Sequence, residues 1–265
     1  MGCLDIDMCY IKINDQAITE QGICLMRYAT FFALLFTLIL SYATTLTVGV
    51  PETDPPFIMA SSVNQFVGFD AEFMSEVCRR ISAKCIFKPL NYGQIFNAIE
   101  SGSIDLAIGS LTKTPSRERT FLFTSTYMPS YAQYLINKGS SIHSVDDLLG
   151  KTFGIANTSI YADMVISKFG DRVKIKYYKF HRGMLSALQN GDVDVLLMDK
   201  ATTDYWIANT DNQYLQLGAP IQYGSGYGII VNKNEVPLVS MINNAVTAMR
   251  KDGTYQRIYS TYFSQ

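Results

Sequence analysis

Two segments of this chain repeat one pattern, and that repeat constrains the fold more than any other feature. Residues 98–110 read AIESGSIDLAIGS, and residues 187–199 read ALQNGDVDVLLMD. Each segment holds the end of a helix, a glycine, an acidic residue and then an apolar run that ends in a polar side chain, Ser110 or Asp199. The repeat predicts two similar α/β halves that grip a polar ligand between them.

The composition is that of a globular protein with ample core material. Of the 265 residues, 48% are apolar and 17% are charged, and the formal net charge is −1. This near-neutral balance, without a block of like charge, gives no support to binding of nucleic acid or of an anionic surface. The sequence contains neither a Cys/His cluster with metal-ligand spacing nor a glycine-rich phosphate loop, so we expect no metal and no cofactor.

The first 43 residues are expected to lie outside the folded unit. Arg27 precedes a mostly apolar run, and Ser41-Tyr42-Ala43 places small residues before a cleavage point. This pattern predicts a cleaved signal peptide over 26–43 and a periplasmic protein. The alternative is a membrane anchor, but the apolar run is well short of the roughly 20 residues that span a bilayer. Residues 1–25 do not fit the signal pattern, and we expect them to be an overextended start or a disordered segment.

The mature chain alternates strand-like and helix-like segments, which predicts an α/β layered fold. The expected strands are 46–50, 86–87, 104–108, 131–136, 152–156, 173–178, 193–198 and 228–231. The expected helices are 69–81, 92–100, 145–149, 160–169, 183–189, 199–209, 236–251 and 253–262.

Two connections, near 128–133 and 222–227, are expected to pass between the halves. They divide the mature chain into one lobe of 44–130 with 225–265 and a second lobe of 131–224. Two crossings form a hinge, which suits closure around a ligand in the cleft between the lobes.

Polar side chains that directly follow strands are the candidate ligand contacts, because ligands of open α/β sheets bind beyond the carboxyl ends of strands. The Arg117 guanidinium can hold a carboxylate through two parallel hydrogen bonds, and Ser110 and Thr112 can add donors. Asp199 ends an apolar strand, where an anionic acceptor suits an ammonium group. The alternatives are a surface arginine near Glu118 and, for Asp199, a helix N-cap. Together the two charges match those of a free α-amino acid.

The mature chain resembles the bacterial periplasmic solute-binding proteins of polar amino-acid ABC transporters, which are extracellular solute-binding proteins of family 3. The resemblance covers nearly all of 44–265. It is carried by LTVGV…PPF (46–57), GFDAEF (68–73), GSIDLAIGSLTKTPSRER (102–119), FLFTSTY (121–127) and GDVDVLLMD (191–199). It implies a type II periplasmic-binding-protein fold and a monomer that delivers an amino acid to an inner-membrane ABC permease.

The resemblance also implies a role for each matched residue of the cleft. Arg117 grips the α-carboxylate, flanked by Ser110 and Thr112, and Asp199 receives the α-ammonium group. Thr158 and Ser159 match the second-lobe segment that meets the carboxylate. Tyr92 matches the aromatic residue that stacks on the ligand side chain. An ordinary core position is the alternative for Tyr92.

The loop after the first strand departs from the family pattern and bears on specificity. Pro51 stands where relatives commonly have an acid, and Asp54 stands where they have an aromatic, while Glu52 lies close by. Two carboxylates near the side-chain pocket favour a cationic ligand such as arginine, lysine or ornithine. A neutral ligand such as glutamine is the alternative if one carboxylate caps the turn. Asp70 either braces this loop or meets the far end of the ligand.

The two cysteines of the mature chain, Cys78 and Cys85, predict one disulfide, because an even count in an exported protein favours pairing. Two buried thiols are the alternative. The spacing in CRRISAKC is similar to that of a disulfide in some basic amino-acid binders of the family. The closed loop is short, so we expect a stabilisation of roughly 2–3 kcal/mol.

A binding protein without catalysis is the leading hypothesis, and two other classes remain. Some proteins similar to this family are cyclohexadienyl dehydratases acting on arogenate or prephenate, which need a positioned proton donor or acceptor. His143 and His181 follow no core strand and are expected in solvent, which leaves Glu52 as the candidate. A receptor ectodomain is the third class. Since the chain ends at Gln265 without a further domain, we favour a free binding protein.

Overall fold

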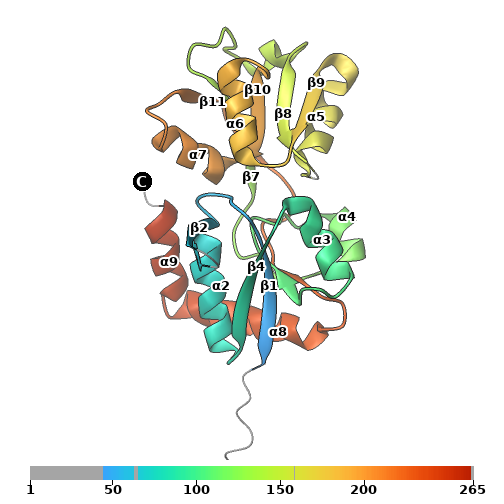
Figure 1. Ribbon diagram of the computed structural model, residues 1–265, viewed down its shortest axis with the longest axis vertical. Helices are drawn as coiled ribbons and strands as arrows, with labels where there is room; N and C mark the ends of the chain where they lie inside the picture. The colour runs from blue at the N-terminus through green and yellow to red at the C-terminus, as the bar shows by residue number, and fades with distance from the viewer. Residues whose placement is uncertain (1–43, 63–64, 158, 264–265) are drawn as a thin grey trace, which may run out of the picture. The chain divides into compact units, whose positions relative to one another are not determined.

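The computed structural model describes residues 44–62, 65–157 and 159–263 (Figure 1). The predicted signal peptide and the segment before it lie outside the described residues. In the part of the chain that is described, no helix has both the length and the apolar character needed to cross a membrane.

The first sheet has five strands in the order β4-β1-β5-β12-β6. Strand β1 pairs in parallel with β4 and β5, and β12 runs antiparallel to β5 and β6. The strands are β1 (Thr45–Pro51), β4 (Lys84–Leu90), β5 (Leu106–Ala107), β6 (Leu122–Phe123) and β12 (Ile230–Val231). A small hairpin joins β2 (Met59–Ser62) to β3 (Gln65–Val67).

Helices cover both faces of the first sheet (Figure 1). They are α2 (Phe69–Arg80), α3 (Tyr92–Glu100), α8 (Val236–Lys251) and α9 (Thr254–Phe263), and a short helix α4 (Pro115–Thr120) without buried residues follows β5. Helices α2, α8 and α9 share a core cluster with Leu106, whereas α3 shares the opposite cluster with Ala107. Successive strand residues point to opposite faces, so a strand as short as β5 contributes to both cores.

The second sheet also has five strands, in the order β11-β7-β10-β8-β9. Helix α5 packs in one core cluster, and α6 and α7 pack in the other. The strands are β7 (Tyr131–Asn137), β8 (Thr152–Ala156), β9 (Lys174–Tyr178), β10 (Val195–Asp199) and β11 (Tyr214–Gln222). The helices are α5 (Tyr161–Phe169), α6 (His181–Asn190), α7 (Lys200–Ala208) and the 3-10 turns η1 (Val145–Leu148) and η2 (Gly170–Arg172).

The sequence repeat corresponds to the middle strand of each sheet. Strand β5 is the third of five in the first sheet, and β10 is the third of five in the second. Each follows a helix, α3 or α6, across a short turn. The repeated segments therefore place Ser110 and Asp199 after the central strands, at the carboxyl ends where ligands of such sheets bind.

The chain crosses between the two sheets twice, after β6 and after β11. The crossing segments are hydrogen-bonded to each other: Tyr227 N donates to the Met128 carbonyl at 2.7 Å, and Tyr127 N donates to the Tyr227 carbonyl at 2.9 Å. The α/β fold with two crossings is therefore confirmed. The predicted disulfide is also present, joining Cys78 in α2 to Cys85 in β4.

Candidate functional site

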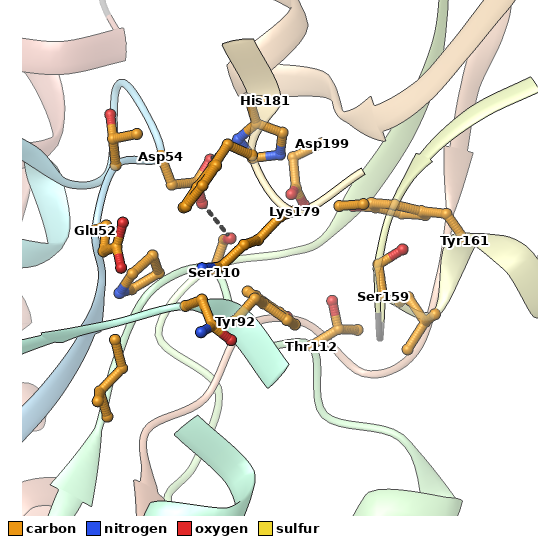
Figure 2. A pocket seen from close by; sticks show the side chains of 17 residues that line it. Glu52, Asp54, Tyr92, Ser110, Thr112, Ser159, Tyr161, Lys179, His181 and Asp199 are labelled. Atoms are coloured by element: carbon orange, nitrogen blue, oxygen red, sulfur yellow. Dashed lines mark hydrogen bonds and ion pairs between the residues drawn. The ribbon is translucent and has the colours of Figure 1, made fainter. Parts of the chain in front are cut away.

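A pocket lies at the carboxyl ends of the central strands and takes its walls from both sheets (Figure 2). From the first sheet come the loop after β1, the start of α3 and the segment after β5. From the second come the end of β8, the start of α5, the segment between β9 and α6, and the end of β10. The lining residues are Pro51, Glu52, Thr53, Asp54, Leu90, Asn91, Tyr92, Ser110, Thr112, Ala156, Ser159, Ile160, Tyr161, Lys179, Phe180, His181 and Asp199.

The turn that carries Ser110 is held in an unusual backbone conformation. Gly109 has φ +143°, and a Cβ at this position would lie 2.2 Å from the Pro51 Cδ. Ser110 itself has φ +46°, in the left-handed region that L residues rarely adopt. Two carboxylates hold it there: Ser110 N donates to Asp70 Oδ2 at 2.9 Å, and Ser110 Oγ donates to Asp54 Oδ2 at 2.7 Å. Asp70 thus braces the turn under the pocket.

Asp54 is contacted by residues from both sheets. Its side chain is buried, with the residue 2% exposed, and Figure 2 shows it facing Ser110 from the loop after β1. From the second sheet, Thr202 Oγ1 donates to Asp54 Oδ1 at 3.1 Å, and His181 Nδ1 lies 3.5 Å from the same oxygen. The carboxylate therefore sits where the two sheets meet.

Asp199 also turns its carboxylate toward the pocket and does not cap α7. It stands at the N-cap position, yet its side chain makes no capping hydrogen bond. Its carboxylate accepts the Tyr227 hydroxyl and also the Tyr161 hydroxyl. Burial raises the pKa of Asp199, and the nearby charge of Asp54 raises it further, against the two tyrosine hydrogen bonds, which lower it.

Asp54 and Asp199 place two buried carboxylates at the pocket, and a third, Asp70, lies behind Ser110. Burial raises the pKa of Asp70 to about 7, although hydrogen bonds from Ser110 and Tyr127 lower it, and the charges of Asp54 and Asp199 contribute to the rise. Within the described residues, none of the three carboxylates is ion-paired with a lysine or arginine; His181 alone lies close, beside Asp54. Such a pocket favours a positively charged group.

Arg117 lies next to the pocket and is not one of its lining residues. Its Nη1 donates to the Thr112 carbonyl at 3.0 Å, and its guanidinium carbon lies 4.6 Å from the centre of the Phe96 ring and 6.0 Å from that of Tyr92. Thr112 and Tyr92 do line the pocket. The guanidinium therefore contacts two residues that line the pocket, Thr112 and Tyr92, and does not line the pocket itself.

The remaining predicted residues divide between the pocket and the undescribed part of the chain. Glu52 lines the pocket with its side chain exposed. Ser159 lines the opposite wall, and its Oγ is buried without a hydrogen-bond partner, so it is available to a ligand. Thr158 lies outside the described residues. No group of three or more His, Cys, Asp or Glu side chains suited to a metal ion occurs among the described residues.

Sequence reasoning missed the segment between β9 and α6. Lys179, Phe180 and His181 all line the pocket (Figure 2). The expectation that His181 is in solvent was wrong: α6 begins at His181 rather than at Gly183, and this side chain is only 16% exposed. The signal was present, since these residues directly follow a strand, as the other candidates do.

Comparison with known proteins gives one consistent family. Residues 46–265 match the model of the bacterial extracellular solute-binding proteins, family 3. The putative ABC transporter arginine-binding protein 2 of Escherichia coli (strain K12) is 27% identical over 241 residues, covering 87% of this chain and 95% of the relative.

Two solved structures are similar in fold as well as in sequence. An arginine 3rd transport system periplasmic binding protein from Legionella pneumophila superposes with a TM-score of 0.80 at 34% identity, covering 83% of this chain and all of the other. An ancestral arginine-binding protein bound to glutamine superposes with a TM-score of 0.77 at 31% identity, covering 84% of this chain and all of the other. This chain belongs to the bacterial extracellular solute-binding proteins, family 3.

Proposed function

We propose that this protein binds a cationic L-amino acid, with arginine the first candidate, in the pocket between its two sheets. The observation that carries the proposal is the pair Asp54 and Asp199, two buried carboxylates at the pocket without a lysine or arginine partner among the described residues. A ligand with two positive groups relieves the cost of burying both charges. The arginine-binding relatives support the same ligand class.

Each end of the amino acid has a proposed partner. The α-ammonium group binds Asp199, and the α-carboxylate binds Arg117 with the help of Ser110 and Thr112. Arg117 reaches the ligand by leaving the Thr112 carbonyl, which a carboxylate replaces as a stronger, charged acceptor. On the opposite wall, Ser159 supplies its unpartnered hydroxyl.

The ligand side chain lies toward the loop after β1. Glu52 and Asp54 provide negative charge for a guanidinium or ammonium group, and Tyr92 provides an aromatic face at the start of α3. By its match to the family, Thr158 is also proposed to contact the α-carboxylate.

We further propose that the chain works as two lobes, 44–130 with 225–265 and 131–224, that close on the ligand through the paired crossings. The closed form, a periplasmic monomer of residues 44–265, delivers the amino acid to an ABC permease in the inner membrane. Ligand binding favours the closed state only to the extent that the ligand binds that state more tightly.

Catalysis is the competing function, and His181 is the observation that favours testing it. Its Nδ1 lies 3.5 Å from Asp54 Oδ1 at the pocket, so the site contains a titratable side chain of the kind that acid–base catalysis uses. Turnover of prephenate or arogenate by the purified protein would replace the binding proposal with a dehydratase. We propose that no turnover occurs.

Calorimetry of single variants with L-arginine tests the proposed site. Arg117→Ala removes the carboxylate partner and Asp199→Asn removes the ammonium partner, so each is expected to weaken binding at least 100-fold, since charged hydrogen bonds in a closed site are worth about 2–3 kcal/mol or more. Arg119→Ala is the matched control, because Arg119 lies on the same short helix and is exposed. Affinities of all three variants equal to that of the native chain would contradict the site.

A further inference from the structure

We infer that Asp54 is a latch between the two lobes: its carboxylate, fixed to the first sheet, accepts the Thr202 hydroxyl from the second sheet and holds the lobes together. This inference rests on the proposed closure. It gives Asp54 a role that is separate from supplying charge to a ligand. The latch is defined here as the Ser110–Asp54–Thr202 hydrogen-bond chain.

The first-sheet side of the latch is rigid. Asp54 N donates to the Ile58 carbonyl at 2.7 Å, and the Asp54 carbonyl accepts hydrogen bonds from Phe57 N and Ile58 N at 2.8 and 2.9 Å. The side chain is fixed in turn by the Ser110 hydroxyl. The backbone and one carboxylate oxygen are therefore set before any contact with the second sheet.

The second-sheet side presents a neutral donor from a buried helix. Thr202 lies in the first turn of α7, directly after β10, and is fully buried. Its hydroxyl meets the Asp54 oxygen that Ser110 leaves free. Separation of the lobes breaks this bond, together with the neighbouring contact between His181 and Asp54, so the bond contributes to the closed arrangement.

His181 adds a second contact to the same oxygen. The charged groups that line this part of the pocket are Glu52, Asp199 and Lys179, with Asp70 behind Ser110. The Thr202 hydroxyl carries no charge at any ordinary pH, so its removal takes no charged group from the pocket. The latch can therefore be tested through Thr202 without altering the charge of the pocket.

Neighbouring threonines provide a matched pair of variants. Thr202→Val removes the hydroxyl that bonds Asp54, whereas Thr203→Val removes a hydroxyl that is equally buried but has no hydrogen-bond partner. Thr202→Ser keeps the donor. Neither threonine lines the pocket.

The experiment measures the dissociation rate of L-arginine and the radius of gyration of the unliganded protein by small-angle scattering. Thr202→Val is expected to release arginine about 5- to 10-fold faster, because the closed state loses one net hydrogen bond. Thr203→Val and Thr202→Ser are expected to release it at a rate within about twofold of the native chain. Equal rates for both valine variants would overturn the latch.

Failure of the proposed function gives a different result. If the native chain binds no amino acid, the ligand proposal fails, and scattering then decides the latch without it. A larger radius for unliganded Thr202→Val than for Thr203→Val supports the latch, and equal radii overturn it.

Discussion

At the scale of single residues, the buried carboxylate of Asp70 leads to a prediction about how stability depends on pH. Asp70 holds Ser110 N and the Tyr127 hydroxyl with one oxygen, while its other oxygen has no partner among the described residues. Its pKa is raised to about 7, mainly by burial. With this pKa, the folded state keeps a proton on Asp70 over a range of pH in which the unfolded chain has released it.

The sign of the effect follows from that proton. Between about pH 4 and 7 the folded state binds more protons than the unfolded state, so the free energy of unfolding falls as the pH rises, by up to about 1.4 kcal/mol per pH unit for one group. Asp70→Asn keeps an acceptor for Ser110 N and is expected to flatten this slope. Urea unfolding at pH 5, 6 and 7 measures it, with the exposed Asp171→Asn as control. An unchanged slope in Asp70→Asn would show that Asp70 does not carry this proton.

At the scale of elements, the sequence predicts the bounds of a helix best where the helical spacing of apolar residues is clear. Helices α3 and α8 match their predicted bounds, because each has a clear helical spacing of apolar residues, and α3 also has a reciprocal capping box between Asn91 and Gln94. Strand β11 was not predicted. Only three of its nine residues are apolar and buried or half-buried, and their spacing is irregular. Gly218 and Pro220 interrupt the strand, so its sequence lacks the alternation of apolar and polar residues that predicts a strand.

The site could be predicted to a similar degree. Ser110, Thr112 and Asp199, which were predicted because they follow the strands of the repeat, all line the pocket. His181 was missed because the predicted start of its helix was two residues late. The placement of Arg117 against Phe96 depends on tertiary packing, which spacing along the chain does not encode.

The turn after β5 gives a prediction at this scale. Gly109→Ala would place a Cβ against Pro51 at a positive φ, so we expect destabilisation of about 2–4 kcal/mol and weaker arginine binding through displacement of Ser110. Gly139→Ala is the control, because nothing lies within 4 Å of a Cβ there. Thermal unfolding and calorimetry measure both effects. A Gly109→Ala variant as stable as Gly139→Ala would contradict this account of the turn.

At the scale of the whole molecule, two sheets with the same central motif end in different groups. The first presents Ser110 beside Arg117, and the second presents Asp199. Paired crossing segments connect the sheets, and Asp54 is contacted from both. This asymmetry on a common scaffold is what lets the proposed cleft distinguish the two ends of an amino acid.

The central claim is that the pocket selects a cationic L-amino acid. The most direct measurement is calorimetric titration of the 44–265 chain with L-arginine and with L-citrulline, which has nearly the same shape but a neutral side chain, and with L-glutamine. Because Glu52 and Asp54 face the proposed side-chain pocket, arginine is expected to bind at least 100-fold more tightly than either neutral ligand. Equal affinity for arginine and citrulline, or tighter binding of glutamine, would contradict the claim.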